Sequence, residues 1–413
     1  MSNDKAIFIS LIGKGRGRGI EGNKGYEKAY YFFDEINDTI YTSFFGSALY
    51  KVLLKQGYYV DKWLIFGTNQ SNWSELLFVI DEKYHDEMSE LYYKVYDEEE
   101  KGLSEELLNK WESVLQRAIP GIRLIIVDPR DYEVYINHMV KEIPDEQRNI
   151  VLDITHAFRH MPVVIAFSLM ALKHLKQISD IMVYYGAFEL KEDRYNDNEP
   201  TPVLKIDFIN TLVSYAENLA TFNNSGYFPP LLDTLGIQDS ENTYFWLEMN
   251  RQPKSDLESI SKKLKDKTLK DNYEASIAEY IKKEIDPLIG ASLDKRMVER
   301  ARFFFDKKQY LKALILLYEG LILAIGRKHG FGNSLDYKKR EEVRKYISDN
   351  RYTIFEIKDH RETYFDLEYT RNAAAHGSIS KGTQNYVEQE DQFQKLFRDG
   401  LKIYEYITGD KLT

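Results

Sequence analysis

Short apolar runs alternate with amphipathic stretches through the first half of the chain. Runs of strand length, rich in β-branched and aromatic residues, occupy residues 6–12, 29–33, 62–66, 122–128, 150–152 and 181–188. Apolar residues at helical spacing occupy residues 43–54, 75–83, 98–117, 132–141 and 163–175. Strands that alternate with helices in this way predict an α/β fold with a mostly parallel sheet.

The second half of the chain has helical periodicity almost throughout, at residues 205–220, 255–285 and 310–325. A polar stretch at residues 191–202 is typical of a linker or a hairpin, and a Pro-Leu-Ile-Gly break follows at Pro287–Gly290. The sequence therefore predicts three parts. They are a Rossmann-like α/β domain at residues 1–195, an all-α connecting region at 196–290 and an all-α domain at 291–413.

The composition is that of a globular protein with an acidic balance. Of its 413 residues, 43% are hydrophobic and 30% are charged, and no apolar run is long enough to cross a membrane. The chain has no cysteine, which excludes disulfides and thiolate metal sites and predicts a cytoplasmic protein. The formal charge of −10 argues against stable DNA binding, but it leaves room for a small basic site that takes single-stranded RNA.

Polar side chains gather directly after the apolar run Ile150–Leu152. They are Asp153, Thr155, His156 and Arg159, and the helical segment that begins at Val163 follows them. Open α/β sheets bind ligands at the carboxyl ends of their strands, so we expect this cluster to line a pocket. The alternative is structural, with Asp153 or Thr155 capping the next helix and Arg159 as a solvated loop residue.

Two more loops at predicted strand ends carry binding chemistry. Gly13 and Lys14 open a glycine-rich stretch that also holds Arg16, Arg18 and Lys24, and backbone amides with cationic side chains can cradle phosphate. The match to a P-loop is poor because Gly15, rather than Ser or Thr, follows the lysine, and a flexible hairpin is the alternative. A polar loop with Thr68 and Ser71 follows the strand at 62–66.

A second motif lies near the C-terminus, where Arg371 and Asn372 precede three alanines and His376. The alanines favour a helix, and Gly377 suits its C-cap. His376 would then lie at the negative end of the helix dipole, which favours its protonated form. RNA carries its own nucleophile in the 2′-hydroxyl, so histidine for proton transfer and arginine for the phosphorane oxygens would suffice without a metal.

One helix cannot easily aim Arg371 and His376 at the same phosphate, because five residues subtend about 140°. Two copies related by a two-fold axis could do so, which predicts a composite site in a homodimer. The structural alternative is that Arg371 pairs with a nearby carboxylate such as Glu368 and that His376 only ends its helix.

Taken together, these motifs resemble those of the CRISPR-associated CARF and HEPN ribonucleases, which are ancillary effectors of type III CRISPR systems. The resemblance rests on DITHAFRHMP at Asp153–Pro162, GTNQSNW at Gly67–Trp73 and RNAAAH at Arg371–His376. The chain departs from the family pattern at Ala157, where glycine is frequent, and at Asn72, where methionine is common.

The resemblance implies that the N-terminal domain is a CARF sensor and that residues 291–413 are a HEPN ribonuclease domain. The sensor would bind a cyclic oligoadenylate, with cyclic tetra-adenylate favoured, across the two-fold axis of a homodimer. The implied ligand-binding residues are Gly13, Lys14, Thr68, Ser71, Asp153, Thr155, His156 and Arg159. Arg371, Asn372 and His376 would be catalytic, and no metal or other cofactor is implied beyond the allosteric activator.

The expected activity is a ligand-activated endoribonuclease that cuts single-stranded RNA to a 2′,3′-cyclic phosphate and a 5′-hydroxyl. One alternative is that the N-terminal pocket degrades its own cyclic ligand. Another is a sensor that signals by binding a partner and has no nuclease activity. A Rossmann dehydrogenase fits least, because no G-x-G-x-x-G opens a helix with an acidic residue about twenty positions later.

Overall fold

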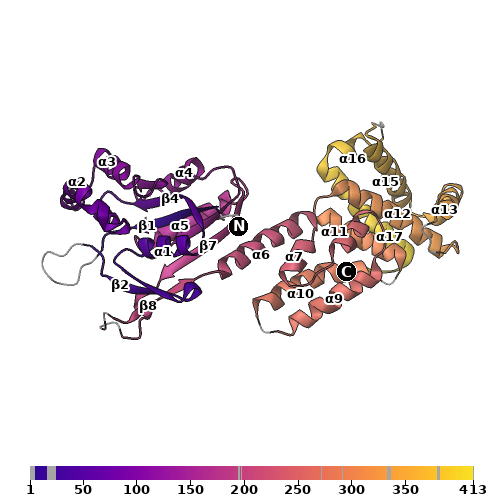
Figure 1. The fold of residues 1–413 in the computed structure, drawn as a ribbon. Helices are drawn as coiled ribbons and strands as arrows, with labels where there is room; N and C mark the ends of the chain where they lie inside the picture. The colour runs from indigo at the N-terminus through magenta and orange to yellow at the C-terminus, as the bar shows by residue number, and fades with distance from the viewer. Residues whose placement is uncertain are drawn as a thin grey trace. The chain divides into compact units, whose positions relative to one another are not determined.

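The computed structural model describes residues 5–15, 25–193, 196, 198–270, 272–290, 292–332, 336–378 and 382–412. The chain forms two compact units, Met1–Val213 and Ser214–Thr413. The first is a mixed α/β domain and the second is helical, which confirms the predicted fold class (Figure 1). Arg16, Arg18 and Lys24 of the glycine-rich stretch lie outside the described residues.

The sheet of the first unit has eight strands within its described residues, in the order β3-β2-β8-β7-β6-β1-β4-β5. Five neighbours, from β7 to β5, run parallel, and β1 lies at the centre of these five. After β1 the chain forms β2 and β3 at one edge of the sheet, then β4 and β5 on the other side of β1, and then β6 beside β1 on the side of β2. The strands are β1 (Lys5–Ile12), β2 (Ala29–Phe33), β3 (Asp38–Thr42), β4 (Tyr59–Gly67), β5 (Ile122–Ile126), β6 (Arg148–Asp153), β7 (Ile178–Gly186) and β8 (Pro200–Lys205).

Helices cover both faces of this sheet, because the side chains of a strand alternate between its two faces. Phe8 of β1 packs in one core with α1 (Phe45–Lys55), α2 (His85–Glu98) and α3 (Glu105–Leu115). Its neighbour Ile9 packs in the other core with α4 (Glu133–Glu142) and α5 (His160–Leu172). Burial on both faces explains why the central strands are continuous apolar runs.

The strands on either side of the polar stretch, β7 and β8, pair with each other, so this stretch does not separate two domains. β8 runs antiparallel to β7 and lies beside β2, which in turn pairs with β3. The predicted domain boundary at residue 195 therefore falls before a strand of the sheet, whereas the compact unit extends to Val213. Pairing of β8 depends on partners far away in the sequence, and no local pattern marks it.

Two predicted helices of the first unit differ from the structure. Residues 75–83 form short 3₁₀ turns, η2 (Trp73–Val79) and η3 (Glu82–Tyr84), rather than an α-helix. The predicted helix at 98–117 is divided between α2 and α3, because Gly102 adopts a φ of 107° between them. A positive φ of this kind ends a helix.

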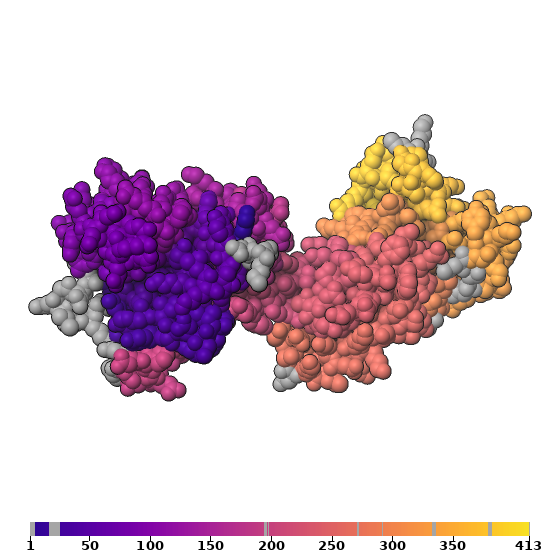
Figure 2. Space-filling model, viewed as in Figure 1, coloured from indigo at the N-terminus to yellow at the C-terminus, as the bar shows by residue number. Residues whose placement is uncertain are grey.

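The second unit is a helical domain with one apolar core that extends from Tyr215 to Ile407. α12 (Tyr310–Lys328) is buried along most of its length, and it packs against α11 (Leu293–Asp306), α15 (Lys358–His376) and α17 (Glu390–Thr408). Figure 2 shows the C-terminal residues, in yellow, packed on the orange helices that precede them in this unit. No helix among the described residues is long and apolar enough to cross a membrane.

The remaining helices complete this unit, and its boundary with the first unit falls within α6. They are α6 (Phe208–Ser225), α7 (Pro229–Thr234), α8 (Glu241–Glu248), α9 (Lys254–Thr268), α10 (Tyr273–Ile285), α11 (Leu293–Asp306), α13 (Tyr337–Asp349), α14 (Arg351–Ile354), α15 (Lys358–His376), α16 (Gln384–Glu388) and α17 (Glu390–Thr408). The Pro-Leu-Ile-Gly break forms a short 3₁₀ turn, η5 (Asp286–Ile289). One apolar core includes residues on both sides of this turn. The predicted division into a connecting region at 196–290 and a domain at 291–413 therefore stays a prediction.

Candidate functional site

A pocket opens at the carboxyl ends of the central strands β1 and β4, which are paired in parallel with Ile12 beside Gly67. Its volume is about 570 Å³. The lining residues are Ile12, Gly13, Lys14, Gly15, Thr68, Gln70, Ser71, Ala157 and Phe158. The pocket is therefore built from the three loops that carry the sequence motifs, at the point where the strand order reverses.

The structure brings four of the eight predicted ligand-binding residues to this lining: Gly13, Lys14, Thr68 and Ser71. The other four, Asp153, Thr155, His156 and Arg159, belong to the same loop as Ala157 and Phe158 but do not line the pocket. Their contacts within the protein indicate what each one does instead. Direct ligand contact stays a prediction for all eight.

The glycine-rich loop after β1 is held tightly by its neighbours. The Gly13 amide donates to the Tyr26 hydroxyl at 2.6 Å, and the Gly15 amide donates to Asn72 Oδ1 at 2.6 Å. These two amides are therefore not free to cradle phosphate, and exposed Lys14 is the cation among the described lining residues. Asn72, one of the departures from the family pattern, fixes the loop through this bond.

Gly13 has no room for a side chain. A Cβ at this position would lie 2.7 Å from the Cα of Ala157, so the β1 loop and the β6 loop are in direct backbone contact. The sequence shows glycine here without showing which segment approaches it.

Thr68 and Ser71 differ in what their hydroxyl groups can do. Ser71 is only 1% exposed, and its Oγ donates to the Ile12 carbonyl at 2.8 Å and accepts from the Thr68 amide at 2.9 Å. Ser71 therefore ties the β4 loop to the end of β1. Thr68 is half-buried and presents the more accessible hydroxyl to the pocket.

Asp153 and Thr155 organise the loop after β6. Asp153 is fully buried, and its Oδ1 accepts from the Thr155 amide at 2.8 Å, while its Oδ2 has no hydrogen-bond partner among the described residues. Burial raises the pKa of this carboxyl to about 7. The Thr155 hydroxyl accepts from the Gly186 amide at 2.9 Å, which ties the loop to β7.

Neither of these residues caps the next helix, so that structural alternative is wrong. α5 begins at His160 and Arg159 occupies its N-cap position, with no side-chain capping bond. The Arg159 side chain is exposed, as the alternative of a solvated loop residue expects.

His156 is a neutral packing residue rather than a cation. Its ring stacks on Tyr26 with centroids 4.1 Å apart, and its Nε2 accepts from the Phe45 amide at 3.2 Å. Desolvation lowers the pKa of this imidazole to about 3. A histidine that accepts a backbone hydrogen bond at Nε2 carries its proton on Nδ1, so it orients the loop without adding positive charge.

Sequence reasoning missed Phe158, whose side chain is 56% exposed at the pocket. An exposed aromatic ring at a pocket offers a surface on which a nucleobase could stack. The sequence does carry a signal for Phe158. It is an aromatic residue within a cluster of polar loop residues.

Ala157 adopts a φ of 76°, in the left-handed region that favours glycine. Replacing Ala157 with glycine should therefore increase the free energy of unfolding by up to about 1 kcal/mol, since relief of strain exceeds the added chain entropy. Urea denaturation at constant m-value measures this change. The control is Ala171→Gly in helical α5, which should lose up to about 1 kcal/mol. A similar loss in both variants would contradict strain at Ala157.

The second motif lies on α15, which ends at His376 with Gly377 in a left-handed C-cap at a φ of 62°. This confirms the predicted helix and cap. His376 is exposed at the end of the helix, whereas Arg371 is partly buried against α12. Arg371 donates to Asn372 Oδ1 at 2.8 Å and to Glu319 Oε1 at 3.0 Å.

The carboxylate partner of Arg371 is thus different from the expected one. Glu368 accepts a hydrogen bond from the Tyr318 hydroxyl at 2.8 Å, while Glu319 of α12 binds Arg371. The guanidinium of Arg371 also lies over the Tyr318 ring, 5.3 Å from its centroid. The ion pair fixes Arg371 on one side of α15, and His376 leaves the helix on another.

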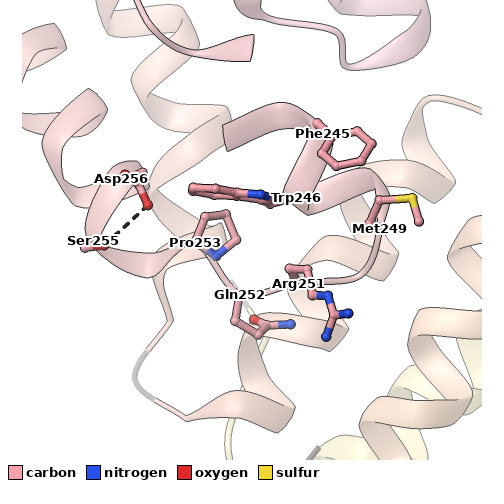
Figure 3. Close-up of a pocket in the computed structure, with 8 residues that line it drawn as sticks. All are labelled: Phe245, Trp246, Met249, Arg251, Gln252, Pro253, Ser255 and Asp256. Atoms are coloured by element: carbon pink, nitrogen blue, oxygen red, sulfur yellow. Dashed lines mark hydrogen bonds between the residues drawn. The ribbon is translucent and has the colours of Figure 1, made fainter. Parts of the chain in front are cut away.

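Another hollow of about 610 Å³ lies in the helical unit, beside α8 and the start of α9 (Figure 3). Phe245, Trp246 and Met249 give it an exposed apolar wall, and Arg251 and Asp256 are its charged lining residues. None of the sequence motifs falls there. The two motif sites therefore remain the candidates.

Comparison with known proteins assigns the unit that contains the first of these sites. Residues 7–197 match the family described as the CARF domain of the CRISPR system endoribonuclease Csx1. Over 93% of its length the chain is 23% identical to the CRISPR-associated protein MJ1674 of Methanocaldococcus jannaschii, and it spans 64% of that protein's length. The match includes all three loops that form the pocket. The N-terminal α/β unit is therefore a CARF domain, and the chain resembles a CRISPR-associated protein over most of its length.

Proposed function

We propose that this protein is an endoribonuclease of type III CRISPR defence that is activated by cyclic oligoadenylate and cleaves single-stranded RNA without a metal ion. The observation that carries the proposal is the presence, in one chain, of a CARF pocket and of a helix that ends in Arg371, Asn372 and His376. The helical region from residue 291 onward would be a HEPN domain. The connecting region at 196–290 would link sensing to cleavage.

The CARF pocket has chemistry suited to an adenylate ligand. The Lys14 ammonium can contact phosphate, the Thr68 hydroxyl can contact ribose or phosphate oxygens, and the Phe158 ring can stack on adenine. The described lining of one pocket supplies one lysine and one exposed aromatic ring. A cyclic tetra-adenylate has four phosphates and four bases, so a second copy of the pocket would supply further contacts.

An apolar face on α5 supports a homodimer. Val163 is 54% exposed and Phe167 is 65% exposed, one helical turn apart, and Leu175 just beyond the helix is 70% exposed. A helix that is apolar on its outer face as well as its inner face usually packs against a partner. This face follows Phe158 directly along the chain, so a two-fold contact through α5 would bring two CARF pockets near each other.

Cleavage would use groups from both copies of α15. Arg371 would stabilise the negative charge that develops on the phosphate, and His376 would transfer the proton of the 2′-hydroxyl or of the leaving oxygen. Asn372 accepts a hydrogen bond from Arg371 and would orient it. The products would be a 2′,3′-cyclic phosphate and a 5′-hydroxyl, because the 2′-oxygen of the RNA is the nucleophile.

The deciding experiment is cleavage of a fluorescent single-stranded RNA in EDTA, with cyclic tetra-adenylate, cyclic hexa-adenylate or no ligand. We expect cleavage with one ring size, tetra-adenylate by analogy, and little without ligand. Ligand binding without cleavage by either ring would favour a sensor that acts through a partner. Cleavage that EDTA abolishes would overturn the metal-independent mechanism.

Degradation of the ligand by the CARF pocket is the less favoured activity. Among the described residues that line the pocket, Lys14 is the one with a titratable side chain. The neighbouring Asp153 is buried and His156 is occupied by the Phe45 amide. These contacts favour binding of the cyclic ligand over acid–base attack on it.

Replacing Lys14 with alanine should raise the ligand concentration needed for activation by about 10- to 100-fold. A hydrogen bond to a charged group contributes about 1.5–3 kcal/mol, and each 1.4 kcal/mol is a factor of ten. Titration of RNA cleavage with cyclic tetra-adenylate measures the shift, and the rate at saturating ligand should persist. Lys51→Ala, at an exposed position on α1, is the control. Equal shifts in both variants would contradict a contact between Lys14 and the ligand.

A further inference from the structure

One buried carboxylate in the helical unit holds three arginines. Glu319 of α12 is 4% exposed, and its Oε1 accepts from Arg371 at 3.0 Å and from Arg344 at 2.7 Å. Its Oε2 accepts from Arg340 at 2.8 Å. Arg340 and Arg344 lie one turn apart on α13, so a helix without any recognised motif places two guanidinium groups beside Arg371.

The cluster has more hydrogen-bond donors than Glu319 can use. Each guanidinium carries five N–H groups, and a carboxylate has about four acceptor sites. The Nε atoms of Arg340 and Arg344 are buried and have no hydrogen-bond partner among the described residues. Other donors are engaged at the rim, where Arg344 also binds Glu341 and Arg371 binds Asn372.

The arrangement leaves the arginines partly accessible. Their side chains are 23% exposed for Arg340 and 24% exposed for both Arg344 and Arg371. Arg344 and Arg371 both lie over the ring of Tyr318, at 5.8 and 5.3 Å from its centroid. Aromatic packing and a shared carboxylate fix the orientation of these guanidinium groups.

The charge of this cluster also favours an anionic ligand. Three cations share the single buried carboxylate of Glu319, in a chain whose formal charge is −10. The carboxylates of Glu341 and Glu368 lie nearby, but Glu341 is at the exposed rim and Glu368 accepts from the Tyr318 hydroxyl. An approaching anion with several acceptor oxygens could reach the partly exposed guanidinium groups, whose directions Glu319 fixes. A phosphodiester fits, since guanidinium groups bind phosphate oxygens in a planar, two-point geometry.

We propose that Arg340 and Arg344 form a binding site for the phosphodiester backbone of single-stranded RNA beside Arg371, and that Glu319 positions all three arginines. This inference rests on the proposed ribonuclease function and extends it to substrate binding. Arg340 and Arg344 would hold phosphates adjacent to the cleaved one. Glu319 would be a positioning residue, because it acts on RNA only through the arginines.

RNA binding tests the proposal in the full chain carrying His376→Ala, in which we expect cleavage to be slow. The anisotropy of a fluorescent single-stranded RNA is measured at several salt concentrations, with cyclic tetra-adenylate present. The test variant carries Arg340→Gln and Arg344→Gln. The matched control carries Lys338→Gln and Lys345→Gln, which remove the same charge from exposed positions about 100° or more around α13 from either arginine.

We expect the arginine pair to weaken RNA binding at least tenfold and to reduce the slope of log K against log salt by about 1.4, because two phosphate contacts are lost and each contributes about 0.7 on a single strand. The lysine pair should change binding by less than about threefold. A variant with Arg340→Lys and Arg344→Lys keeps the charge but loses the planar fork, so it should bind with intermediate affinity. Thermal unfolding of each variant checks that the helical unit remains folded.

The outcomes distinguish failure of the RNA-backbone site from failure of the proposed ribonuclease function. The RNA-backbone site would be overturned if the arginine and lysine pairs had equal effects. It would also be overturned if both the folded Arg-to-Lys variant and the Gln variant bound RNA as the parent does. Neither outcome would affect the proposed ribonuclease function. No RNA binding by the His376→Ala parent, together with no cleavage by the wild type, would overturn both proposals.

Steady-state cleavage provides the second readout, with His376 intact. Loss of the arginine pair should raise KM more than it lowers kcat, since the contacts form in the ground state as well as in the transition state. Glu319→Gln should lower kcat, because Arg371 loses its anchor. A Glu319→Gln variant with unchanged kcat would exclude its positioning role.

Discussion

Replacing His376 with alanine is expected to slow ligand-dependent RNA cleavage by about 10²- to 10⁴-fold, the usual contribution of a general acid–base group. His376 is the exposed final residue of α15, where its imidazole can reach a substrate. Single-turnover cleavage at saturating cyclic tetra-adenylate measures the chemical step. Binding of the activator should not change, because the CARF pocket lies in the other unit.

His360, near the other end of the same helix, provides the matched control. Its ring packs against Tyr406, with centroids 4.8 Å apart, so His360→Ala removes an imidazole from α15 without touching the proposed active site. It should retain cleavage within a few-fold of the wild type. Full activity in the His376→Ala protein, or equal loss in both variants, would show that the end of α15 is only a helix terminus.

Asp153→Asn is expected to remove a large pH dependence from the stability of the CARF domain. Burial raises the pKa of the Asp153 carboxyl from its ordinary value near 4 to about 7, so the folded chain keeps a proton that the unfolded chain releases. This group therefore contributes most to stability below about pH 4, and its contribution falls as the pH rises to about 7. The difference corresponds to about 4 kcal/mol, at 1.36 kcal/mol for each unit of pKa.

The Asp153→Asn variant should thus be more stable than the wild type at pH 8, and the two should converge near pH 4. The introduced amide would still accept from the Thr155 amide through Oδ1, as Asp153 does. Urea denaturation from pH 4 to pH 8 gives the free energy of unfolding of both proteins. Parallel curves would contradict a raised pKa at this position.

Asp128, just after β5, is the opposite case and serves as the control. It is exposed, and its bonds to the Arg130 side chain and amide lower the pKa of its carboxyl to about 2. Its favourable contribution is present above the ordinary pKa of aspartate and is lost as the pH falls toward 2. Asp128→Asn should therefore show no gain in stability at pH 8.

The sequence alone predicted where the pocket lies, but it did not predict the contacts that each residue makes. Polar residues after apolar strands place chemistry at the carboxyl edge of a parallel sheet, and three such loops do meet around one cavity. The polar side chains of His156 and Asp153 predict ligand contacts, and these contacts stay predictions. The structure adds the neighbours that no local pattern shows, which are Tyr26 and Phe45 for the histidine and a dry interior for the aspartate.

The alternation of strand and helix patterns, the helix through RNAAAH and its glycine cap were determined by the sequence itself. Periodicity and capping depend on residues a few positions apart, so a local pattern reports them. Only the tertiary structure decided that β8 joins the sheet, that Asn72 holds the glycine-rich loop, and that Glu319 gathers Arg340, Arg344 and Arg371. Each of these pairings joins residues far apart in the chain. Many polar groups in the sequence have the same chemistry, and only the packing of whole helices and strands determines which of them meet.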